Sequence, residues 1–298
     1  NNVYLHRQDR YRFDRYHVIQ NSSLADSMAR FIRYEMIQHP AVNNLAEADL
    51  PSTKELKSVI RQFRMSLSKS FYSGEKQAVG DHQVAVTPMV GVGKRNNVLN
   101  QKITALLADA KREIVLCTPY FNLPKVVLRE VKRAIKRGVK VHFVVGDKTA
   151  SDFYIAPDKP FKAIGGLPYL YEMNLRKFAY ANEGYIASGG LSIHLWKHDS
   201  NSYHLKGLWV DACTMLLTGN NVNPRAWALD LENGLLIEDP KQHLLAKFTA
   251  EFDNIHQHTQ QISSYKQLET IHDYPVKIQR LLKKVIRTRA DRLLKRIL

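Results

Sequence analysis

Two side chains that could take part in catalysis lie two positions apart in an apolar stretch of the chain: the imidazole of His204 and the ammonium group of Lys206. In an extended strand, residues two apart point to the same face, so an imidazole and an ammonium group project into one site. Asp211 ends this run, and a second apolar run at 215–217 leads to a Gly-Asn pair at 219–220. The pattern predicts a β-hairpin that places a glycine turn and an amide side chain beside the His and Lys.

This set of side chains suits phosphoryl transfer. Lys206 supplies a positive charge for a non-bridging phosphate oxygen, and Asn220 and Asn223 can donate amide hydrogens to the same group. The backbone at Gly219 can approach a phosphate closely because glycine has no side chain. His204 can attack phosphorus or pass a proton to the leaving group.

A histidine in either role needs a carboxylate on its second ring nitrogen, which fixes the tautomer. Glu232 and Asp230 are the candidates that the downstream sequence offers. Metal chemistry is not expected, since no Cys/His cluster has the spacing of a zinc site. The Lys and the amide donors would stand where a divalent ion otherwise would, so we expect no metal and no cofactor.

The spacing of these residues is similar to the HxK signature of the phospholipase D superfamily. The signature is present as His204-x-Lys206-x4-Asp211 with Gly219-Asn220-x-x-Asn223, and the tail of the family motif as Asn223, Arg225, Asp230 and Glu232. The family usually has Gly-Ser where this chain has Gly-Asn, and one residue fewer between the aspartate and the glycine. Residues 118–124, 146–149, 167–172 and 203–240 further resemble the bacterial CDP-diacylglycerol–serine O-phosphatidyltransferases of that superfamily.

The resemblance implies an α/β fold with a mixed sheet flanked by helices, in two pseudo-twofold halves of which the first is incomplete here. It also implies transfer of a phosphatidyl group from CDP-diacylglycerol to L-serine through a phosphatidyl-histidine, with release of CMP. His204 would be the general acid and base, with the nucleophile as the alternative role, and Glu232 would orient it. Lys206 and Asn223 would stabilise phosphoryl charge, while Asn220 and Arg225 would contact substrate. Asp211 belongs to the catalytic motif, although support of the hairpin is its expected part.

The N-terminal residues resemble the tail of a second motif copy. Residues 13–19 are similar to 229–237, and Asn1 then corresponds to Asn223 as a substrate-binding residue of the first half. The partner His and Lys of that copy would lie upstream of Asn1. A chance similarity is the alternative.

The resemblance and a polar linker at 73–81 divide the chain into three parts, and hydrophobic periodicity predicts the elements in each. Residues 1–80 are the remainder of the first half, with helices at 22–38 and 52–72. Residues 81–240 are the second half, with a strand–helix–strand unit at 113–145. Residues 241–298 are a helical extension, with helices at 240–262, 264–272 and 275–298. A glycine turn at 91–94 could hold a phosphate, with a plain turn as the alternative, and Asp147 and Lys148 could contact substrate, with a solvated loop pair as the alternative. The aromatic loop at 151–166 could insert into the bilayer interface or line an acyl groove, with a packed lid as the alternative.

The formal net charge of +16 in 298 residues indicates an anionic partner, either nucleic acid or an acidic membrane surface. Residues 275–298 carry nine basic residues against one acidic residue, and their apolar residues recur at roughly helical spacing. A basic amphipathic helix of this kind is typical of a membrane-surface element. The alternative to a membrane-surface helix is a basic helix that packs on the domain and faces solvent. Binding of RNA is the third interpretation. Because no apolar run is long enough to span a bilayer, we expect a cytoplasmic protein bound peripherally to the inner face of the membrane.

Two other classes of function stay open at this point. One is another phosphodiesterase of the same superfamily: a cardiolipin synthase, a phospholipase or a nuclease. The other is a basic membrane- or RNA-binding module without catalytic activity. The sequence leaves the oligomeric state open.

Overall fold

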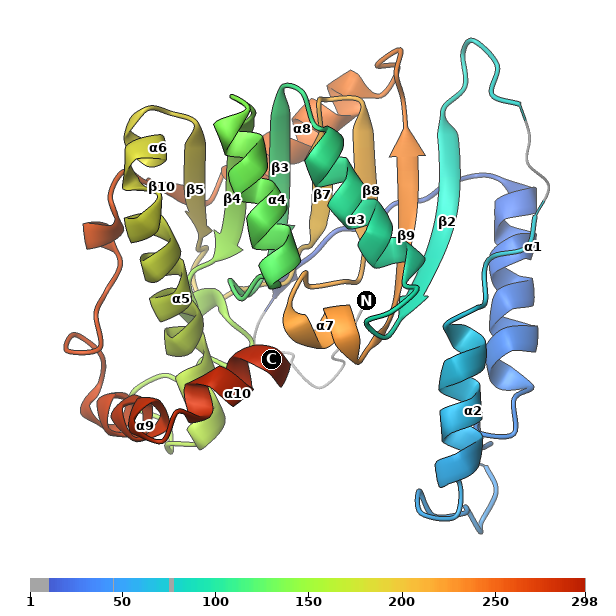
Figure 1. The fold of residues 1–298 in the computed structure, drawn as a ribbon, viewed down its shortest axis with the longest axis horizontal. Coiled ribbons are helices and arrows are strands. Elements are labelled where there is room, and N and C mark those ends of the chain that lie inside the picture. The colour runs from blue at the N-terminus through green and yellow to red at the C-terminus, as the bar shows by residue number, and fades with distance from the viewer. Residues whose placement is uncertain (1–10, 45, 75–77, 298) are drawn as a thin grey trace.

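A mixed sheet of eight strands forms the centre of the molecule (Figure 1), in a computed structural model that describes residues 11–44, 46–74 and 78–297. The strand order is β10-β5-β4-β3-β7-β8-β9-β2. The strands are β2 (Ala85–Val92), β3 (Glu113–Thr118), β4 (Lys140–Gly146), β5 (Leu191–Trp196), β7 (Gly207–Val210), β8 (Thr214–Thr218), β9 (Leu231–Glu238) and β10 (Thr259–Ile262).

The parallel part of the sheet is built from β3, β4 and β5, and the remaining neighbours pair antiparallel. Parallel strands need a crossover, which α4 (Lys125–Lys136) supplies between β3 and β4. Gly138 adopts φ +87° just after this helix, a backbone conformation that glycine takes without strain. The predicted strand–helix–strand unit is therefore confirmed.

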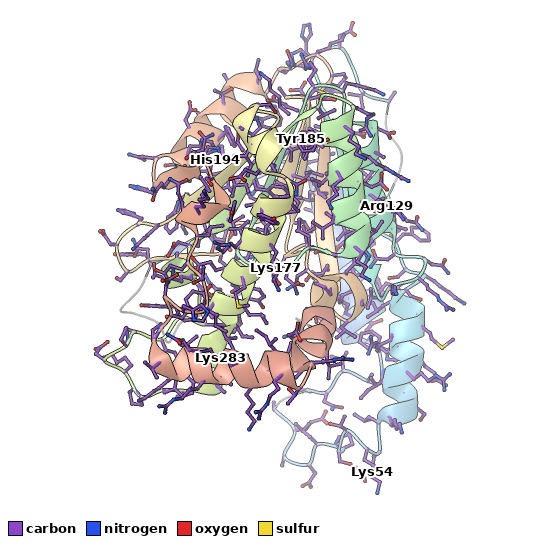
Figure 2. All side chains as sticks on the ribbon, turned by 60° about the vertical axis from the view of Figure 1, so that its left-hand side comes forward. Lys54, Arg129, Lys177, Tyr185, His194 and Lys283 are labelled. Carbon is purple, nitrogen blue, oxygen red and sulfur yellow. The ribbon has the colours of Figure 1, made fainter. Side chains whose placement is uncertain are left out.

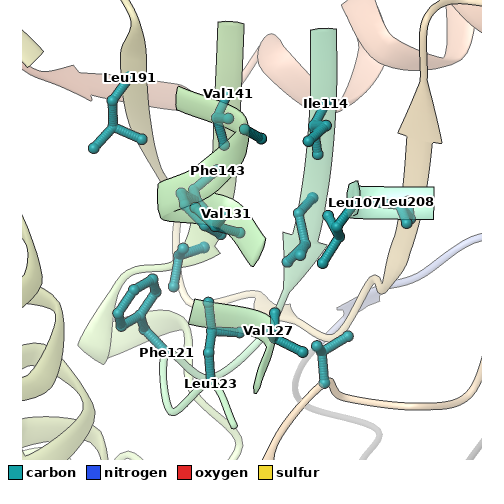
Figure 3. Close-up of a cluster of buried hydrophobic side chains, with 14 of the residues drawn as sticks. Leu107, Ile114, Phe121, Leu123, Val127, Val131, Val141, Phe143, Leu191 and Leu208 are labelled. Carbon is teal, nitrogen blue, oxygen red and sulfur yellow. The ribbon is translucent and has the colours of Figure 1, made fainter. Parts of the chain in front are cut away.

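Helices α3 (Val98–Asp109), α4 and α5 (Leu167–Ala181) cover one face of the sheet. Charged side chains such as Arg129 and Lys177 lie on their outer surface (Figure 2). Their inner sides meet the strands in the largest apolar cluster, where Leu107, Val131 and Phe143 come together (Figure 3). This core holds the sheet that positions the site.

The opposite face is covered by α8 (Leu245–His256) and by the N-terminal segment of the chain. The short strand β1 (Arg12–Phe13) pairs in parallel with β6 (Ser202–Tyr203), immediately before His204. The Phe13 ring stacks on Trp196, with 5.0 Å between ring centroids. The first residues that the structure describes thus lie against the HxK segment, almost two hundred residues later in sequence.

Two helices stand apart from the sheet, beside β2 (Figure 1). Asn21 caps α1 (Ser22–Arg30), which continues as a π-helix over Phe31–Ile37, and α2 (Lys57–Leu67) runs beside it. Phe31 and Leu67 attach them to Val90 and Val92 of β2. The helix predicted at 22–38 is confirmed, whereas the one predicted at 52–72 is shorter.

The C-terminal extension differs most from the prediction. The single helix expected at 240–262 is wrong beyond α8, because residues 259–262 form β10 and satisfy the open edge of β5. Only a 3-10 turn, Tyr265–Gln267, appears where a helix was expected at 264–272. The last predicted helix is broken into α9 (Val276–Arg287) and α10 (Ala290–Ile297) at Arg289, whose φ is +57°. In the described part of the chain, no helix is both long and apolar enough to cross a bilayer.

Candidate active site

His204 and Lys206 lie on the extended connection between β6 and β7, and both side chains are almost completely buried. Lys206 Nζ donates a hydrogen bond to the backbone oxygen of His204 at 2.5 Å and lies 2.5 Å from His204 Nδ1. The structure thus brings the imidazole and the ammonium group together. The segment was predicted to be part of a strand, but it lies between β6 and β7. The two side chains are nevertheless neighbours, as the prediction required.

Asp14 is the carboxylate that contacts His204. Its Oδ2 atom lies 3.3 Å from His204 Nδ1 and 3.7 Å from Lys206 Nζ. A backbone hydrogen bond of 2.9 Å from His204 N to Phe13 O continues the β1–β6 ladder and fixes Asp14 at this point. The expectation that Glu232 or Asp230 contacts His204 is therefore corrected: the contact comes from the N-terminal segment, which the sequence had assigned to the other half.

The ionisation of the three groups follows from burial and mutual charge. Burial would raise the pKa of Asp14, but the His204 hydrogen bond and the Lys206 charge outweigh it and hold that pKa below its ordinary value. Burial lowers the pKa of His204; Asp14 opposes this shift, and the Lys206 charge adds to it. Burial also lowers the pKa of Lys206 to about 8, against the opposing charge of Asp14. The imidazole is therefore neutral at pH 7, as a general base requires.

The other ring nitrogen of His204 faces a second carboxylate, Asp152. The distance from His204 Nε2 to Asp152 Oδ2 is 3.9 Å. Arg12 forms an ion pair with the same oxygen, and the Tyr120 hydroxyl donates to it at 3.3 Å. Burial would raise the pKa of Asp152, yet the Arg12 hydrogen bond and charge keep it below its ordinary value.

Sequence reasoning missed both Asp152 and Arg12. The available signal was the position of residue 152, a few residues beyond the carboxyl end of β4, where ligands of α/β sheets bind. That reasoning selected Asp147 and Lys148 instead. Asp147 caps its own turn by accepting a hydrogen bond from Thr149 N, and Lys148 pairs with Glu172 at 2.9 Å. In the structure these two candidates bind protein groups.

Glu232, on β9, lies beside Gly219 and Lys206 rather than on His204. A Cβ atom at Gly219 would stand 3.1 Å from Glu232 Oε2, so glycine gives the carboxylate room at the turn. Burial raises the pKa of Glu232 to about 7, with Asp230 adding to the shift and Lys206 opposing it. A carboxyl with this pKa exchanges a proton near neutrality.

The two asparagines of the motif hold the turn in shape. The side chain of Asn220 is fully buried, and its Oδ1 accepts a hydrogen bond from Val222 N at 2.7 Å. Its Nδ2 has no hydrogen-bond partner among the described residues, which leaves one buried donor beside the motif. Asn223 Oδ1 caps α7 (Pro224–Ala228) by accepting from Ala226 N at 2.9 Å.

Three further predicted site residues lie elsewhere. Asp211 is at the far end of β7, where its carboxylate accepts from the backbone N–H groups of 111–113, so it supports the hairpin and is withdrawn as a catalytic residue. The Arg225 side chain is 61% exposed and pairs with Asp230 at 3.1 Å, and its charge acts on Glu232, so its role in substrate binding stays a prediction. Asn1 lies outside the described residues.

The glycine turn at 91–94 is also not a phosphate cradle in the structure. Gly91 belongs to β2, and Asn97 occupies the space beside it. Asn97 donates to Gly93 O at 2.9 Å and caps α3 by accepting from Asn100 N. The turn therefore serves the start of α3.

Comparisons with known proteins agree with this geometry. Residues 103–256 match the family model described as "Cardiolipin synthase, PLD-like domain". The chain is 46% identical over 298 residues to the CDP-diacylglycerol–serine O-phosphatidyltransferase of Escherichia coli K12, and 47% identical over 299 residues to that of Haemophilus influenzae. All of this chain and 66% of each relative are covered, so the chain spans about two thirds of their length.

The crystal structure of the Haemophilus influenzae phosphatidylserine synthase superimposes with a TM-score of 0.94 at 46% identity, covering all of this chain and 67% of that one. Likeness at this level extends over the sheet, the helices and the HxK segment alike. The chain therefore belongs to the phospholipase D superfamily and, within it, to the family of bacterial phosphatidylserine synthases.

Proposed function

We propose that the protein transfers a phosphatidyl group from CDP-diacylglycerol to L-serine and releases CMP. The observation that carries this proposal is the buried trio of Asp14, His204 and Lys206 in a chain 46–47% identical to named serine phosphatidyltransferases. Lys206 stabilises the charge of the phosphoryl oxygens, and Asp14 holds the imidazole in position. Nothing in this trio chooses serine, so the acceptor is inferred from the relatives.

His204 acts as the general acid and base in this proposal. When its ring donates from Nδ1 to Asp14, the lone pair on Nε2 is free to take a proton. Before the first step His204 takes a proton from solvent at Nε2. In that step a nitrogen of the other histidine bonds to phosphorus as the bond to CMP breaks, and His204 gives its proton to the leaving phosphate oxygen. In the second step the serine oxygen bonds to phosphorus, the P–N bond breaks, and His204 takes the hydroxyl proton. The alternative assignment makes His204 itself the nucleophile.

The complete site, we infer, includes a second His-Lys pair from outside the described residues. Asp14, from the segment resembling a first motif tail, contacts the histidine of the second motif. If the two motif copies are related by symmetry, Glu232 from the tail of the second motif would contact the histidine of the first motif. The partly buried Glu232 carboxyl, whose pKa burial raises to about 7, supports this arrangement.

The test follows CMP release from labelled CDP-diacylglycerol by the natural full-length protein. We expect release to depend on L-serine, with phosphatidylserine as product and retention of configuration at phosphorus, because two displacements each invert it. Inversion would rule out the histidine intermediate. Release that needs water, or a glycerol lipid, in place of serine would assign the protein to another branch of the superfamily.

We further propose that α9 holds the protein to anionic lipid at the cytoplasmic face of the membrane. Ile278 and Leu282 pack against Tyr169 and Leu170 of α5, so most of its apolar face is already used. Its lysines and arginines lie exposed along the outer side (Figure 2, with Lys283 labelled). Attachment is then chiefly electrostatic, at about 1 kcal/mol for each basic residue close to the lipid surface.

A further inference from the structure

An ion pair lies directly in front of the reactive nitrogen of His204 and takes no part in the HxK motif. Arg12 comes from β1, and Asp152 from the loop that follows β4. Both side chains are largely buried, with 16% and 9% of their surface exposed. Burying two opposite charges costs desolvation energy. A buried pair beside the reacting atom is therefore a candidate for a functional role.

We propose that Arg12 and Asp152 form the subsite for the zwitterionic part of the acceptor: Asp152 accepts hydrogen bonds from the α-ammonium group, and Arg12 donates to the α-carboxylate. The inference rests on the proposed function, in which serine is the acceptor. It adds what the HxK trio lacks, a means of recognising an amino acid.

The distances suit this assignment. His204 Nε2 and Asp152 Oδ2 are 3.9 Å apart. In serine, the hydroxyl oxygen and the ammonium nitrogen are about 3 Å apart in a staggered rotamer, and each hydrogen bond spans about 2.8 Å. The hydroxyl can therefore reach His204 Nε2 while the ammonium group reaches Asp152. The serine oxygen is then placed to bond phosphorus as its proton passes to His204.

The charges suit it as well. A zwitterion offers an ammonium group to the carboxylate and a carboxylate to the guanidinium, so each buried charge keeps a partner when the acceptor binds. Water or a glycerol hydroxyl carries neither charge, so it cannot form ion pairs with Arg12 and Asp152. An acceptor with only one of the two charges matches only one of the two protein groups, and a mismatch of this kind gives large discrimination.

Aromatic rings close the same space. The Tyr120 and His204 rings make a T-shaped contact with 6.3 Å between ring centroids, and Tyr120 packs against Phe153 and Tyr171 at 5.5 and 5.3 Å. These rings limit the room for water beside His204 Nε2. Because water competes with serine for the phosphatidyl group, a dry and charge-complementary subsite favours transfer over hydrolysis.

The experiment measures the ratio of phosphatidylserine to phosphatidate made by the natural full-length protein and by Asp152→Asn. We expect the ratio to fall at least about tenfold in the variant, with a raised KM for L-serine. Asp152→Glu should recover part of the ratio. Asp158→Asn, an exposed aspartate of the same loop, is the matched control and should leave the ratio unchanged. A ratio is independent of how much of each variant folds.

An acceptor series on the unaltered protein gives the second arm. Ethanolamine lacks the carboxylate, and 3-hydroxypropanoate lacks the ammonium group, so each should transfer at least about tenfold less efficiently than L-serine. Equal use of ethanolamine and serine, or an Asp152→Asn variant with an unchanged product ratio, would overturn the subsite while the proposed function stands. Absence of any phosphatidylserine from the unaltered protein would overturn both.

Discussion

Asp14 and His204 are 190 residues apart in the sequence, and the Asp14 Oδ2 and His204 Nδ1 atoms are 3.3 Å apart in the structure. The contact depends on the parallel pairing of β1 with β6, which places Phe13 beside Tyr203 and hence Asp14 beside His204. A segment that resembles the end of one motif thereby completes the other. The site is built from two parts of the chain that only the fold brings together.

Replacement of Asp14 by Asn should preserve the shape of the site and remove the charge that orients the imidazole. We expect kcat for serine transfer to fall by about 10²–10⁴-fold, since an amide can hold the wrong tautomer. The measurement is steady-state kinetics on the natural full-length protein. Asp26→Asn, an exposed aspartate of α1, is the matched control. Full activity of Asp14→Asn would mean that another carboxylate orients His204.

Lys206→Met should remove the charge that stabilises the phosphoryl oxygens while keeping a side chain of similar length. We expect kcat/KM to fall by about 10²–10³-fold, the usual loss when one transition-state donor is removed. Lys102→Met removes a partly exposed lysine that pairs with Glu238 at 3.4 Å, and should have little effect. Near-normal turnover by Lys206→Met would exclude Lys206 from the chemistry.

The raised pKa of Glu232 predicts a pH dependence of stability. Between the ordinary pKa of 4.5 and the folded value of about 7, the native protein binds more protons at this group than the unfolded chain. The free energy of unfolding should therefore fall as pH rises through that window, by about 3 kcal/mol at most. Glu232→Gln should flatten the curve there. Denaturant titrations at pH 4.5, 6 and 7.5 measure it, and an unchanged slope would contradict the assignment.

Arg15 anchors the N-terminal segment, which carries Arg12 and Asp14, to β7 and α8. Its guanidinium lies 4.2 Å from the centre of the Trp209 ring, and its Nη1 atom lies 3.2 Å from Glu251 Oε1. Arg15→Ala would leave the half-buried Glu251 carboxylate without this partner. We therefore expect the free energy of unfolding to fall by about 3 kcal/mol.

Arg129→Ala is the control for Arg15, because the Arg129 side chain is 59% exposed in its pair with Glu130. Glu130 is buried but keeps a second partner, Arg133 at 3.0 Å, so loss of the exposed Arg129 should cost about 1 kcal/mol or less. Thermal or denaturant unfolding of both variants compares them directly. Equal losses would show that the N-terminal segment does not depend on Arg15 for its place on the sheet.

The sequence alone could predict the parts of the fold that have a local cause. The β3–α4–β4 unit follows from apolar periodicity and a closing glycine, and the nearness of His204 to Lys206 follows from extended backbone. β10 was missed because its four residues become a strand only by pairing with β5. The interruption at Arg289 was missed for the opposite reason, since nothing in a continuous basic pattern marks one residue with positive φ.

The candidate site could be predicted only in part from the sequence. The HxK residues and Glu232 could be selected because their spacing resembles a known motif. Asp14, Arg12 and Asp152 could not, because their nearness to His204 depends on the β1–β6 pairing and on the conformation of one loop. Asp211 was selected by the same resemblance, yet the backbone N–H groups of residues 111–113 account for its carboxylate.

Membrane attachment through α9 can be tested by neutralising three of its exposed lysines, Lys277, Lys283 and Lys284, to Gln. At about 1 kcal/mol each, we expect the affinity for vesicles that contain anionic phosphatidylglycerol to fall about 100-fold. Vesicles of phosphatidylcholine alone should bind weakly with or without the change. Co-sedimentation measures both, and added polynucleotide that displaces the protein would show that RNA competes for the same helix.

The matched control removes three lysines from α4 and α5, at positions 132, 136 and 177. It changes the net charge by the same amount on another part of the surface, of which Lys177 is labelled in Figure 2. If attachment depends on α9, this variant keeps nearly all of its affinity. If both variants lose the same affinity, the vesicles respond to net charge alone, and α9 is a basic helix that packs on α5 and faces solvent.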